Sequence, residues 1–400
     1  MKHAIKYLLN RTIFVILFAM AFFCRKRKLK HVNNKIVWFG AYGNSNKGDD
    51  FIFWALKKFI PSKYTIFLSC RDSKFKDEYN VCTFQKGENS FSVLRNIKVM
   101  KKASVFIIGG GGLLESYDDS EDSRRLKMAY IAPFLLAKIL GLRTLILGIG
   151  CNKVHSHNVL LERAIGFMYA NSDVIVTRDK KSLQGFAECS NRINKNAIWT
   201  YDPVFTLPLR IMSKKKTICF LLWPFFLWPE FYSNNVLNQI NETKKKKHML
   251  FLEEIKSCIL EVKQKGYTPI FPVFHFSDRL LLKELGVECY ECNKEEYMRI
   301  IGNSTLVVTM RYHGQITSLL NHTPIISLVV QEKMGELVKN MAIEEFSFSN
   351  LECFNREKFL AMFDKAIKHN WTGTYKSFDK KRSEANEIYN KNVYEYLNSF

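Results

Sequence analysis

Short apolar runs rich in β-branched residues recur along the chain, and amphipathic stretches of helical period separate them. In the first half, these runs cover residues 35–39, 104–108, 144–149, 173–177 and 198–205. In the second half, they cover residues 217–222, 268–275, 306–310 and 324–330. Short runs of this kind are typical of buried strands, and their alternation with helices predicts doubly wound parallel sheets.

A polar and basic stretch at residues 209–216 divides this series into two α/β halves. A chain of 400 residues is long enough for about two domains. We therefore predict a Rossmann-like domain over residues 35–208, a linker over residues 209–216 and a second Rossmann-like domain over residues 217–354, with the two halves facing each other. Residues 355–400 predict a helical tail, and its return to the first half stays open.

Glycines follow several of the predicted strands. The run at residues 35–39 leads into a loop with Gly40, Gly43 and Gly48, and the run at residues 104–108 leads into four consecutive glycines. Glycine lets the backbone approach a ligand closely, although a tight turn alone also explains each cluster. None of these loops has the G-x-G-x-x-G or G-x-x-x-x-G-K-[ST] pattern, which argues against a dinucleotide site or a P-loop.

One strand end carries residues suited to chemistry. The run at residues 306–310 stops at Arg311, Tyr312, His313 and Gly314, and a helical pattern begins at once. A permanent cation and an imidazole are thus expected where a strand gives way to a helix N-terminus, which is where open α/β sheets bind anionic ligands. Taken alone, an arginine paired with a carboxylate and a histidine with a local capping role explain this stretch equally well.

The positive charge is concentrated at the N-terminus. The chain has 60 Lys and Arg residues against 38 Asp and Glu residues, and residues 1–30 contain eight of the basic residues and no acid. The apolar part at residues 13–24 is shorter than the ~20 residues that span a bilayer. For residues 1–34 three interpretations stay open: an anchor lying on anionic lipid, a packed helix, or a signal peptide. The basic cluster after the apolar part favours a cytoplasmic body.

Other partners are not indicated. No zinc-finger or RNP pattern accompanies the positive charge, so we expect no nucleic acid partner. The ten cysteines are scattered, mostly in apolar segments, which is typical of free thiols in a reducing compartment. Cys289 and Cys292 form a lone C-x-x-C pair, and no His, Asp or Glu cluster has ligand spacing, so we expect no metal site.

Five short motifs follow one another in a recognisable order. They are the segments at residues 43–49, 109–113, 178–182, 202–204 and 311–314, followed by the apolar run at residues 324–328 and by Lys333. Together they resemble the polysaccharide pyruvyl transferase family, over roughly residues 35–343. The resemblance implies a glycosyltransferase-B-like fold, with two Rossmann-like domains and the active site in a cleft. It also implies an enzyme that moves a pyruvyl group from phosphoenolpyruvate to sugar hydroxyls, usually as a cyclic ketal, and releases phosphate.

The resemblance also implies roles for individual residues. Arg311 and His313 match the family's Arg-x-His motif, which is associated with phosphoenolpyruvate binding and catalysis, and Arg178 matches its Arg-Asp motif. Since guanidinium groups bind phosphate and carboxylate well, Arg178 and Arg311 are expected to hold phosphoenolpyruvate. His313 would give a proton to the methylene carbon or take one from the attacking hydroxyl, and both roles stay open.

Further residues are expected to contact the substrates. Lys333 is a candidate phosphate contact or a solvated lysine, and Asp49 is a candidate acceptor-side base or a helix cap. The residues expected to face the acceptor sugar are Asn46, Gly48, Asp49, Gly110, Gly111 and Gly112. No cofactor is expected, because phosphoenolpyruvate is itself the donor substrate.

The chain departs from the family pattern at residues 223–232. This aromatic stretch stands where many relatives have a basic residue, and we expect it to meet a sugar face or a lipid carrier, or to pack in the core. The leading hypothesis is a cytoplasmic, membrane-peripheral pyruvyl transferase that modifies a lipid-linked or polymer-repeat sugar in exopolysaccharide or cell-envelope biosynthesis. The alternatives are a nucleotide-sugar-dependent glycosyltransferase of the same fold and a non-catalytic membrane-associated assembly protein.

Overall fold

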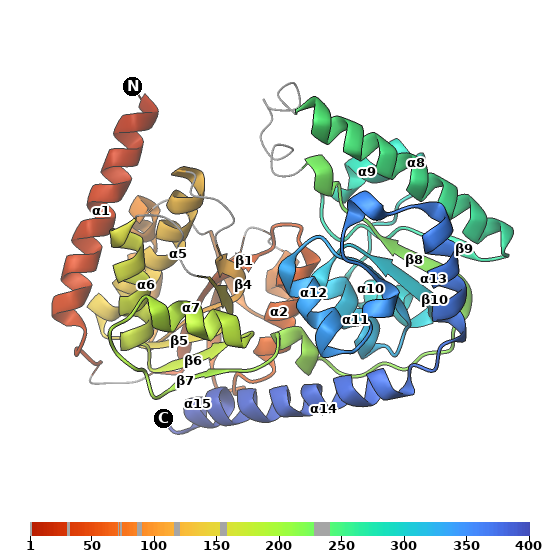
Figure 1. The fold of residues 1–400 in the computed structure, drawn as a ribbon. Helices are drawn as coiled ribbons and strands as arrows, with labels where there is room; N and C mark the ends of the chain where they lie inside the picture. Colours follow the sequence, from red (N-terminus) through yellow and green to blue (C-terminus); the bar gives the residue numbers. More distant parts are fainter. Residues whose placement is uncertain are drawn as a thin grey trace. The chain divides into compact units, whose positions relative to one another are not determined.

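The computed structural model divides the chain into two compact units. It describes residues 2–29, 33–70, 72, 74–85, 90–115, 121–152, 158–227 and 241–400. The first unit comprises Met1–Thr206 together with Ser383–Phe400, and the second comprises Leu207–Arg382. The C-terminal residues of the chain therefore belong to the first unit (Figure 1).

The first unit is built on a seven-stranded parallel sheet in the order β3-β2-β1-β4-β5-β6-β7. Its strands are β1 (Lys35–Tyr42), β2 (Thr65–Cys70), β3 (Cys82–Phe84), β4 (Val105–Leu114), β5 (Arg143–Cys151), β6 (Val174–Thr177) and β7 (Ala197–Trp199). The strand order reverses between β1 and β4. In open α/β sheets, ligands bind outside the carboxyl ends of the strands at such a switch point.

Helices cover this sheet. They are α1 (Lys2–Cys24), α2 (Lys47–Lys57), α3 (Lys74–Tyr79), α4 (Ile97–Met100), α5 (Glu121–Leu140), α6 (Val159–Asn171), α7 (Lys180–Glu188) and α15 (Tyr396–Asn398). On α2, Ile52, Ala55 and Leu56 are buried, and Phe59, just after the end of the helix, is buried as well. The helix begins at Lys47, with Asn46 as its cap.

The second unit has a five-stranded parallel sheet in the order β12-β11-β10-β8-β9. Its strands are β8 (Lys215–Leu221), β9 (Thr268–Ile270), β10 (Ser304–Thr309), β11 (Ile325–Leu328) and β12 (Ser347–Phe348). Its helices are α8 (Glu242–Gln264), α9 (Asp278–Leu285), α10 (Lys294–Asn303), α11 (Tyr312–Leu320), α12 (Glu332–Asn340), α13 (Arg356–Lys368) and the first part of α14 (Thr372–Tyr389). The order reverses between β8 and β10, so Arg311 follows a strand at the switch point.

The N-terminal helix α1 packs on the first unit along one face only. Phe14, Leu17 and Ala21 are buried in the same core as residues of α5 and α6, and the Phe18 ring lies edge-on to Phe167 at 5.6 Å. The other side leaves large apolar side chains exposed, among them Leu8, Leu9, Ile16, Met20 and Phe23. Within the described residues, no helix is both long and apolar enough to cross a membrane.

Candidate active site

The turn from β10 to α11 places Arg311 and His313. The Thr309 hydroxyl oxygen accepts the Arg311 N–H at 2.9 Å, which holds the turn closed. Arg311 is extended and α11 begins at Tyr312, so His313 stands in the first helical turn. A Cβ on Gly314 would lie 2.3 Å from Thr309 Oγ1, a distance that real contacts do not allow. The glycine of this motif is therefore needed for close packing of the helix on the strand.

The Arg311 guanidinium is fixed on several sides. It forms an ion pair with Asp278, whose side chain is only 2% exposed. Its Cζ lies 5.0 Å from the Trp223 ring centroid and 5.7 Å from that of Phe274. The local ion pair that the sequence left open is thus present. Nε of Arg311 is buried and has no hydrogen-bond partner among the described residues.

Among Arg311, Asp278 and His275, the Arg311 guanidinium carries the positive charge. Asp278 Oδ2 accepts the backbone N–H groups of Phe274 at 3.1 Å and His275 at 2.9 Å. Burial raises the pKa of the Asp278 carboxyl, and Arg311 and these hydrogen bonds act in the opposite direction. Burial, and then the nearby Arg311, lower the pKa of His275 to about 3. His275 is therefore neutral near neutral pH and adds no second positive charge.

Lys333 lies close to the same motif. It stands in the first turn of α12, which follows β11, the neighbour of β10 in the sheet. Its Nζ is 5.4 Å from the centroid of the Tyr312 ring, and that ring makes an edge-on contact with the buried His313 at 5.3 Å. The structure thus brings Arg311, His313 and Lys333 together at one edge of the second sheet.

A second cluster forms at the switch point of the first sheet. Asn46 caps α2 by accepting the Gly48 N–H at 3.1 Å, and its Nδ2 donates to Asp49 Oδ2 at 2.8 Å. A Cβ on Gly111 would lie 2.5 Å from Asp49 Oδ1. Gly110 and Gly111 have positive φ angles of 91° and 81°, which glycine adopts without strain. The predicted residues of the loops after β1 and along β4 therefore meet, and Asn46, rather than Asp49, caps the helix.

Arg178 stands at the end of β6 with its guanidinium already matched by carboxylates. It pairs with Glu115, and its Nε lies 3.5 Å from Asp179 Oδ2. The Glu115 carboxylate packs closely against two glycines, Gly112 and Gly150. A Cβ on Gly112 would lie 2.5 Å from one of its oxygens, and a Cβ on Gly150 would lie 2.2 Å from the other. The Arg178 side chain is only 2% exposed, so its positive charge mainly balances the negative charge of Glu115.

Sequence reasoning missed Glu115, His275 and Asp278. Glu115 directly follows β4, His275 ends the apolar run at residues 268–275, and Asp278 lies three residues beyond it. A carboxylate at this position of a parallel sheet was the signal available. Their pairing with Arg178 and Arg311 joins residues 63 and 33 positions apart, and no spacing rule gives such a partner.

The aromatic stretch after β8 is described as far as Leu227. Trp223 and Leu227 are buried, and Phe225 and Phe226 are half-buried, while residues 228–232 lie outside the described residues. In the part of the chain that the structure describes, no three His, Cys, Asp or Glu side chains group as metal ligands would. None of the ten cysteines, all of them in described segments, forms a disulfide bond.

The two parallel sheets define a glycosyltransferase-B-like α/β fold, which confirms the predicted fold class. Similar solved structures include Anabaena HepE in complex with UDP and glucose, with 12% identity, a TM-score of 0.55 and coverage of 92% of this chain and 100% of that chain. UDP-GlcNAc 2-epimerase from Methanocaldococcus jannaschii has 14% identity and a TM-score of 0.54, covering 88% and 98%. S. aureus MnaA with UDP has 11% identity and a TM-score of 0.55, covering 92% and 98%. At these identities the likeness concerns the fold alone.

The sequence itself identifies the family. Residues 46–332 match the family model for polysaccharide pyruvyl transferase, and the chain belongs to this family. The resemblance of the five motifs is thereby confirmed. The match begins at Asn46 and includes Arg178, Arg311 and His313, while Lys333 lies one residue beyond its end. No curated protein matches the chain significantly.

Proposed function

We propose that the protein transfers a pyruvyl group from phosphoenolpyruvate to sugar hydroxyls in exopolysaccharide or cell-envelope biosynthesis. The family implies a transferase and a polysaccharide substrate. The observation that carries the proposal is the cluster of Arg311, His313 and Lys333 around the carboxyl end of β10. Two cations and an imidazole at a strand–helix junction suit a donor with a phosphate and a carboxylate.

The proposed reaction consumes two sugar hydroxyl groups. One proton goes to the methylene carbon of phosphoenolpyruvate, which becomes a methyl group, and the first sugar oxygen bonds to C2. The second sugar oxygen then bonds to C2 while the bond from C2 to the phosphate oxygen breaks. Inorganic phosphate leaves with the second hydroxyl proton, and the product is a cyclic ketal.

In this proposal Arg311 binds the donor through the edge that Asp278 leaves unused. Its fixed position supports charge stabilisation without reorganisation of the site. Lys333 contacts the donor phosphate, and His313 moves the proton, either to the methylene carbon or from the attacking hydroxyl.

On the first unit we assign the saccharide acceptor to the loops after β1 and β4. The residues assigned to it are Asn46, Gly48, Asp49, Gly110, Gly111 and Gly112. Arg178 is proposed to contact substrate from its pair with Glu115. Because Arg178 is buried and paired with Glu115, a ligand that contacts Arg178 would also contact the Glu115 carboxylate.

We further propose that the protein works in the cytoplasm at the membrane surface, where a lipid-linked acceptor would be presented. The exposed apolar side of α1 and the basic residues that follow it, Arg25 to Lys28, support this placement.

The test is release of phosphate from phosphoenolpyruvate by the full chain in the presence of sugar acceptors. Arg311→Ala and His313→Ala should each lower the rate by at least roughly a hundredfold, as expected for loss of charge stabilisation or acid–base catalysis. Arg356→Ala is the matched control, because Arg356 forms an exposed ion pair with Glu261 on the same unit. Full activity in both site variants would show that the site assignment is wrong.

A thermal-shift comparison separates the proposal from a glycosyltransferase of the same fold. A ligand that binds the folded chain raises its melting temperature by mass action. Phosphoenolpyruvate should stabilise the protein, and UDP-glucose should not. Stabilisation by UDP-glucose alone would favour the glycosyltransferase, and sugar binding without turnover of any donor would favour a non-catalytic assembly protein.

A further inference from the structure

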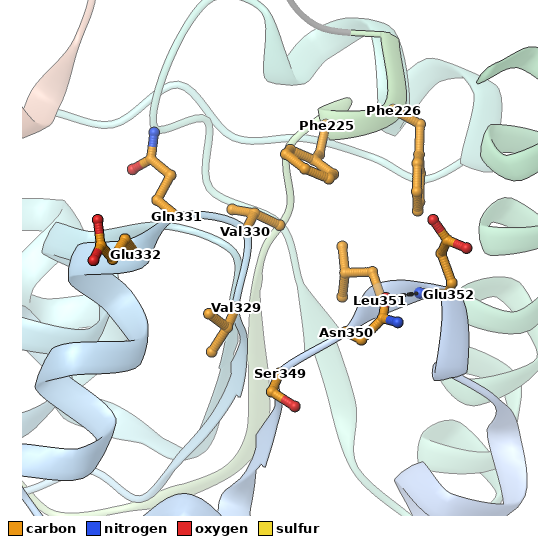
Figure 2. A pocket seen from close by; sticks show the side chains of 10 residues that line it. All are labelled: Phe225, Phe226, Val329, Val330, Gln331, Glu332, Ser349, Asn350, Leu351 and Glu352. Atoms are coloured by element: carbon orange, nitrogen blue, oxygen red, sulfur yellow. Dashed lines mark hydrogen bonds between the residues drawn. The ribbon is translucent and has the colours of Figure 1, made fainter. Parts of the chain in front are cut away.

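The second unit contains a pocket next to the Arg311 cluster. It lies where the chain leaves β8, β11 and β12, and its volume is about 440 Å³. Figure 2 shows its lining, which consists of Phe225, Phe226, Val329, Val330, Gln331, Glu332, Ser349, Asn350, Leu351 and Glu352. The volume falls within the range of small-molecule sites, about 300–1,000 Å³.

The charge of this lining argues against an anionic ligand. Glu332 and Glu352 supply two carboxylates, and the lining contains no Lys, Arg or His. Glu352 also forms an ion pair with Lys247, whose Nζ lies 2.6 Å from Glu352 Oε1. Lys247 does not line the pocket, and its positive charge balances the negative charge of Glu352. Phosphoenolpyruvate or a nucleotide diphosphate would meet carboxylates here, whereas a neutral ligand would not be repelled.

The remaining groups suit a ring that has both hydroxyls and an apolar face. In Figure 2 the phenyl rings of Phe225 and Phe226 lie on one side of the pocket, across from Val330 and Leu351. The other lining side chains include five polar ones: Gln331, Glu332, Ser349, Asn350 and Glu352. Aromatic faces cover apolar surface, and carboxylate and amide oxygens accept hydrogen bonds from hydroxyl groups. Sugars offer this combination.

The pocket adjoins the Arg311 cluster. The Phe225 ring lies 5.7 Å from the Trp223 ring, and the Arg311 Cζ lies 5.0 Å from the centroid of Trp223. Gln331 and Glu332 directly precede Lys333, whose Nζ faces Tyr312. A ligand in the pocket would therefore lie beside the groups assigned to the donor.

We propose that this pocket binds a neutral sugar ring of the saccharide acceptor. The identification of that sugar as an acceptor rests on the proposed pyruvyl transfer, whereas the sugar binding itself does not. The second unit would then hold one neutral ring of the acceptor as well as the donor.

Binding is measured on the full chain by saturation-transfer NMR, without phosphoenolpyruvate. The probes are glucose, galactose, N-acetylglucosamine and N-acetylmannosamine, with UDP as a competitor. Phe225→Ala should weaken binding of the preferred sugar by roughly threefold to tenfold, as expected for the loss of an aromatic contact. Glu352→Gln should also weaken binding, because one strong hydrogen-bond acceptor is lost.

Two control variants match these changes. Glu357→Gln removes a carboxylate from the exposed first turn of α13, and Leu260→Ala removes an exposed apolar side chain from α8. Both controls should bind sugar like the unchanged protein. Thermal melts of all variants show whether Phe225→Ala folds, and Glu352→Gln tests the pocket independently of that ring.

The outcomes separate this inference from the proposed function. Unchanged sugar affinity in Phe225→Ala and Glu352→Gln, or displacement of the sugar by UDP, would overturn the pocket assignment. If phosphate release depends on a sugar whose KM is unaffected by both changes, the pyruvyl transfer stands and the pocket assignment falls. If no sugar promotes phosphate release but both changes weaken sugar binding, the pocket assignment stands and the proposed function falls.

Discussion

At the scale of single residues, the buried partner of Arg311 matters as much as the arginine itself. Asp278 neutralises one edge of the guanidinium and is held by two backbone N–H groups. A guanidinium fixed in this way needs no reorientation when an anion arrives. Arg311 can therefore form its ion pair with Asp278 and also bind the donor as proposed. The sequence alone had offered these two roles as alternatives.

The first prediction concerns this pair. Asp278→Ala should lower the free energy of unfolding by about 3–5 kcal/mol, because it leaves the Arg311 charge buried without its partner. Asp364→Ala is the matched control, since Asp364 pairs with Lys265 at 3.0 Å on the surface. The control should cost at most about 1 kcal/mol. Urea unfolding measures both, and equal losses in the two variants would contradict a special role for Asp278.

His275 gives a prediction for acid stability. The pKa of its imidazole is lowered to about 3 in the folded chain, so between about pH 6.5 and pH 3 the unfolded chain binds a proton that the folded chain does not. The free energy of unfolding should therefore fall as the pH falls, by up to about 1.4 kcal/mol per pH unit from this group. His275→Asn should flatten that slope in urea unfolding between pH 7 and pH 4. An unchanged slope would show that His275 is protonated without cost.

Sequence reasoning found the residue types but not their partners. Arg311 and His313 could be placed because an apolar strand ends directly before them and a helical pattern begins directly after them. Asp278 lies 33 positions before Arg311 on a different strand–helix connection, and only tertiary packing brings it there. The capping of α2 by Asn46 was missed for a related reason. Several adjacent polar residues can cap a helix, and the loop geometry decides which one does.

At the scale of elements, the junction of β10 and α11 depends on one glycine. Gly314→Ala would place a Cβ 2.3 Å from Thr309 Oγ1 and also near the Leu221 side chain of β8. We expect a loss of about 1–3 kcal/mol in the free energy of unfolding, because a packed helix must move off its strand. Phosphate release should fall as well, because Thr309 holds the Arg311 backbone.

The control for this change is Gly373→Ala in α14. A Cβ at Gly373 would meet nothing within 4 Å, so the substitution should be neutral or stabilising by up to about 1 kcal/mol. Thermal and urea unfolding compare the two variants. A Gly314→Ala variant as stable and active as Gly373→Ala would contradict the packing argument.

Of the three interpretations of residues 1–34 that the sequence left open, the structure shows α1 as a packed helix. It packs on the first unit through Phe14, Leu17 and Ala21, and the side away from them stays apolar, with Phe23 83% exposed. A helix seated on a globular unit with an apolar outer side and a basic segment after it suits attachment to an anionic lipid surface. The apolar run alone did not predict this division, because it contains apolar residues on every side of the helix.

Vesicle binding tests this element. The full chain should co-sediment with phosphatidylglycerol vesicles more than with phosphatidylcholine vesicles, and added salt should reduce the difference. Changing both Ile16 and Phe23 to Glu should lower binding severalfold. Ile193→Glu is the matched control, because Ile193 is 89% exposed elsewhere on the first unit. Equal binding by the double variant and the control would contradict a lipid-facing α1.

At the scale of the whole molecule, the fold class was predictable and the strand order was not. The alternation of apolar runs and helices gave two parallel α/β sheets, as found. The strands β2, β3 and β12 were missed, and β3 and β12 have only three and two residues, too few for a periodic pattern. The run predicted over residues 268–275 forms a strand only over Thr268–Ile270, and Pro272, which lacks an N–H, follows it.

The position of the site in each sheet also required the structure. A sequence gives strands in chain order, whereas the switch points between β1 and β4 and between β8 and β10 arise from the order in which strands pair. The candidate residues Asp49 and Gly111 meet at the first switch point, and Arg311 stands at the second. The motifs had indicated these residues without indicating why they belong together.

The return of the chain to the first unit has a consequence for its biogenesis. Tyr389 stacks on Phe59 at 5.4 Å, and the Tyr64 hydroxyl donates to the Leu397 carbonyl at 2.9 Å. These contacts join residues made early in translation to residues made only after the whole second unit. On a ribosome, the first unit must therefore wait, with this part of its apolar surface uncovered, until the entire second unit has been synthesised. The order of synthesis thus makes the second unit the first that can be completed, although it comes later in the sequence.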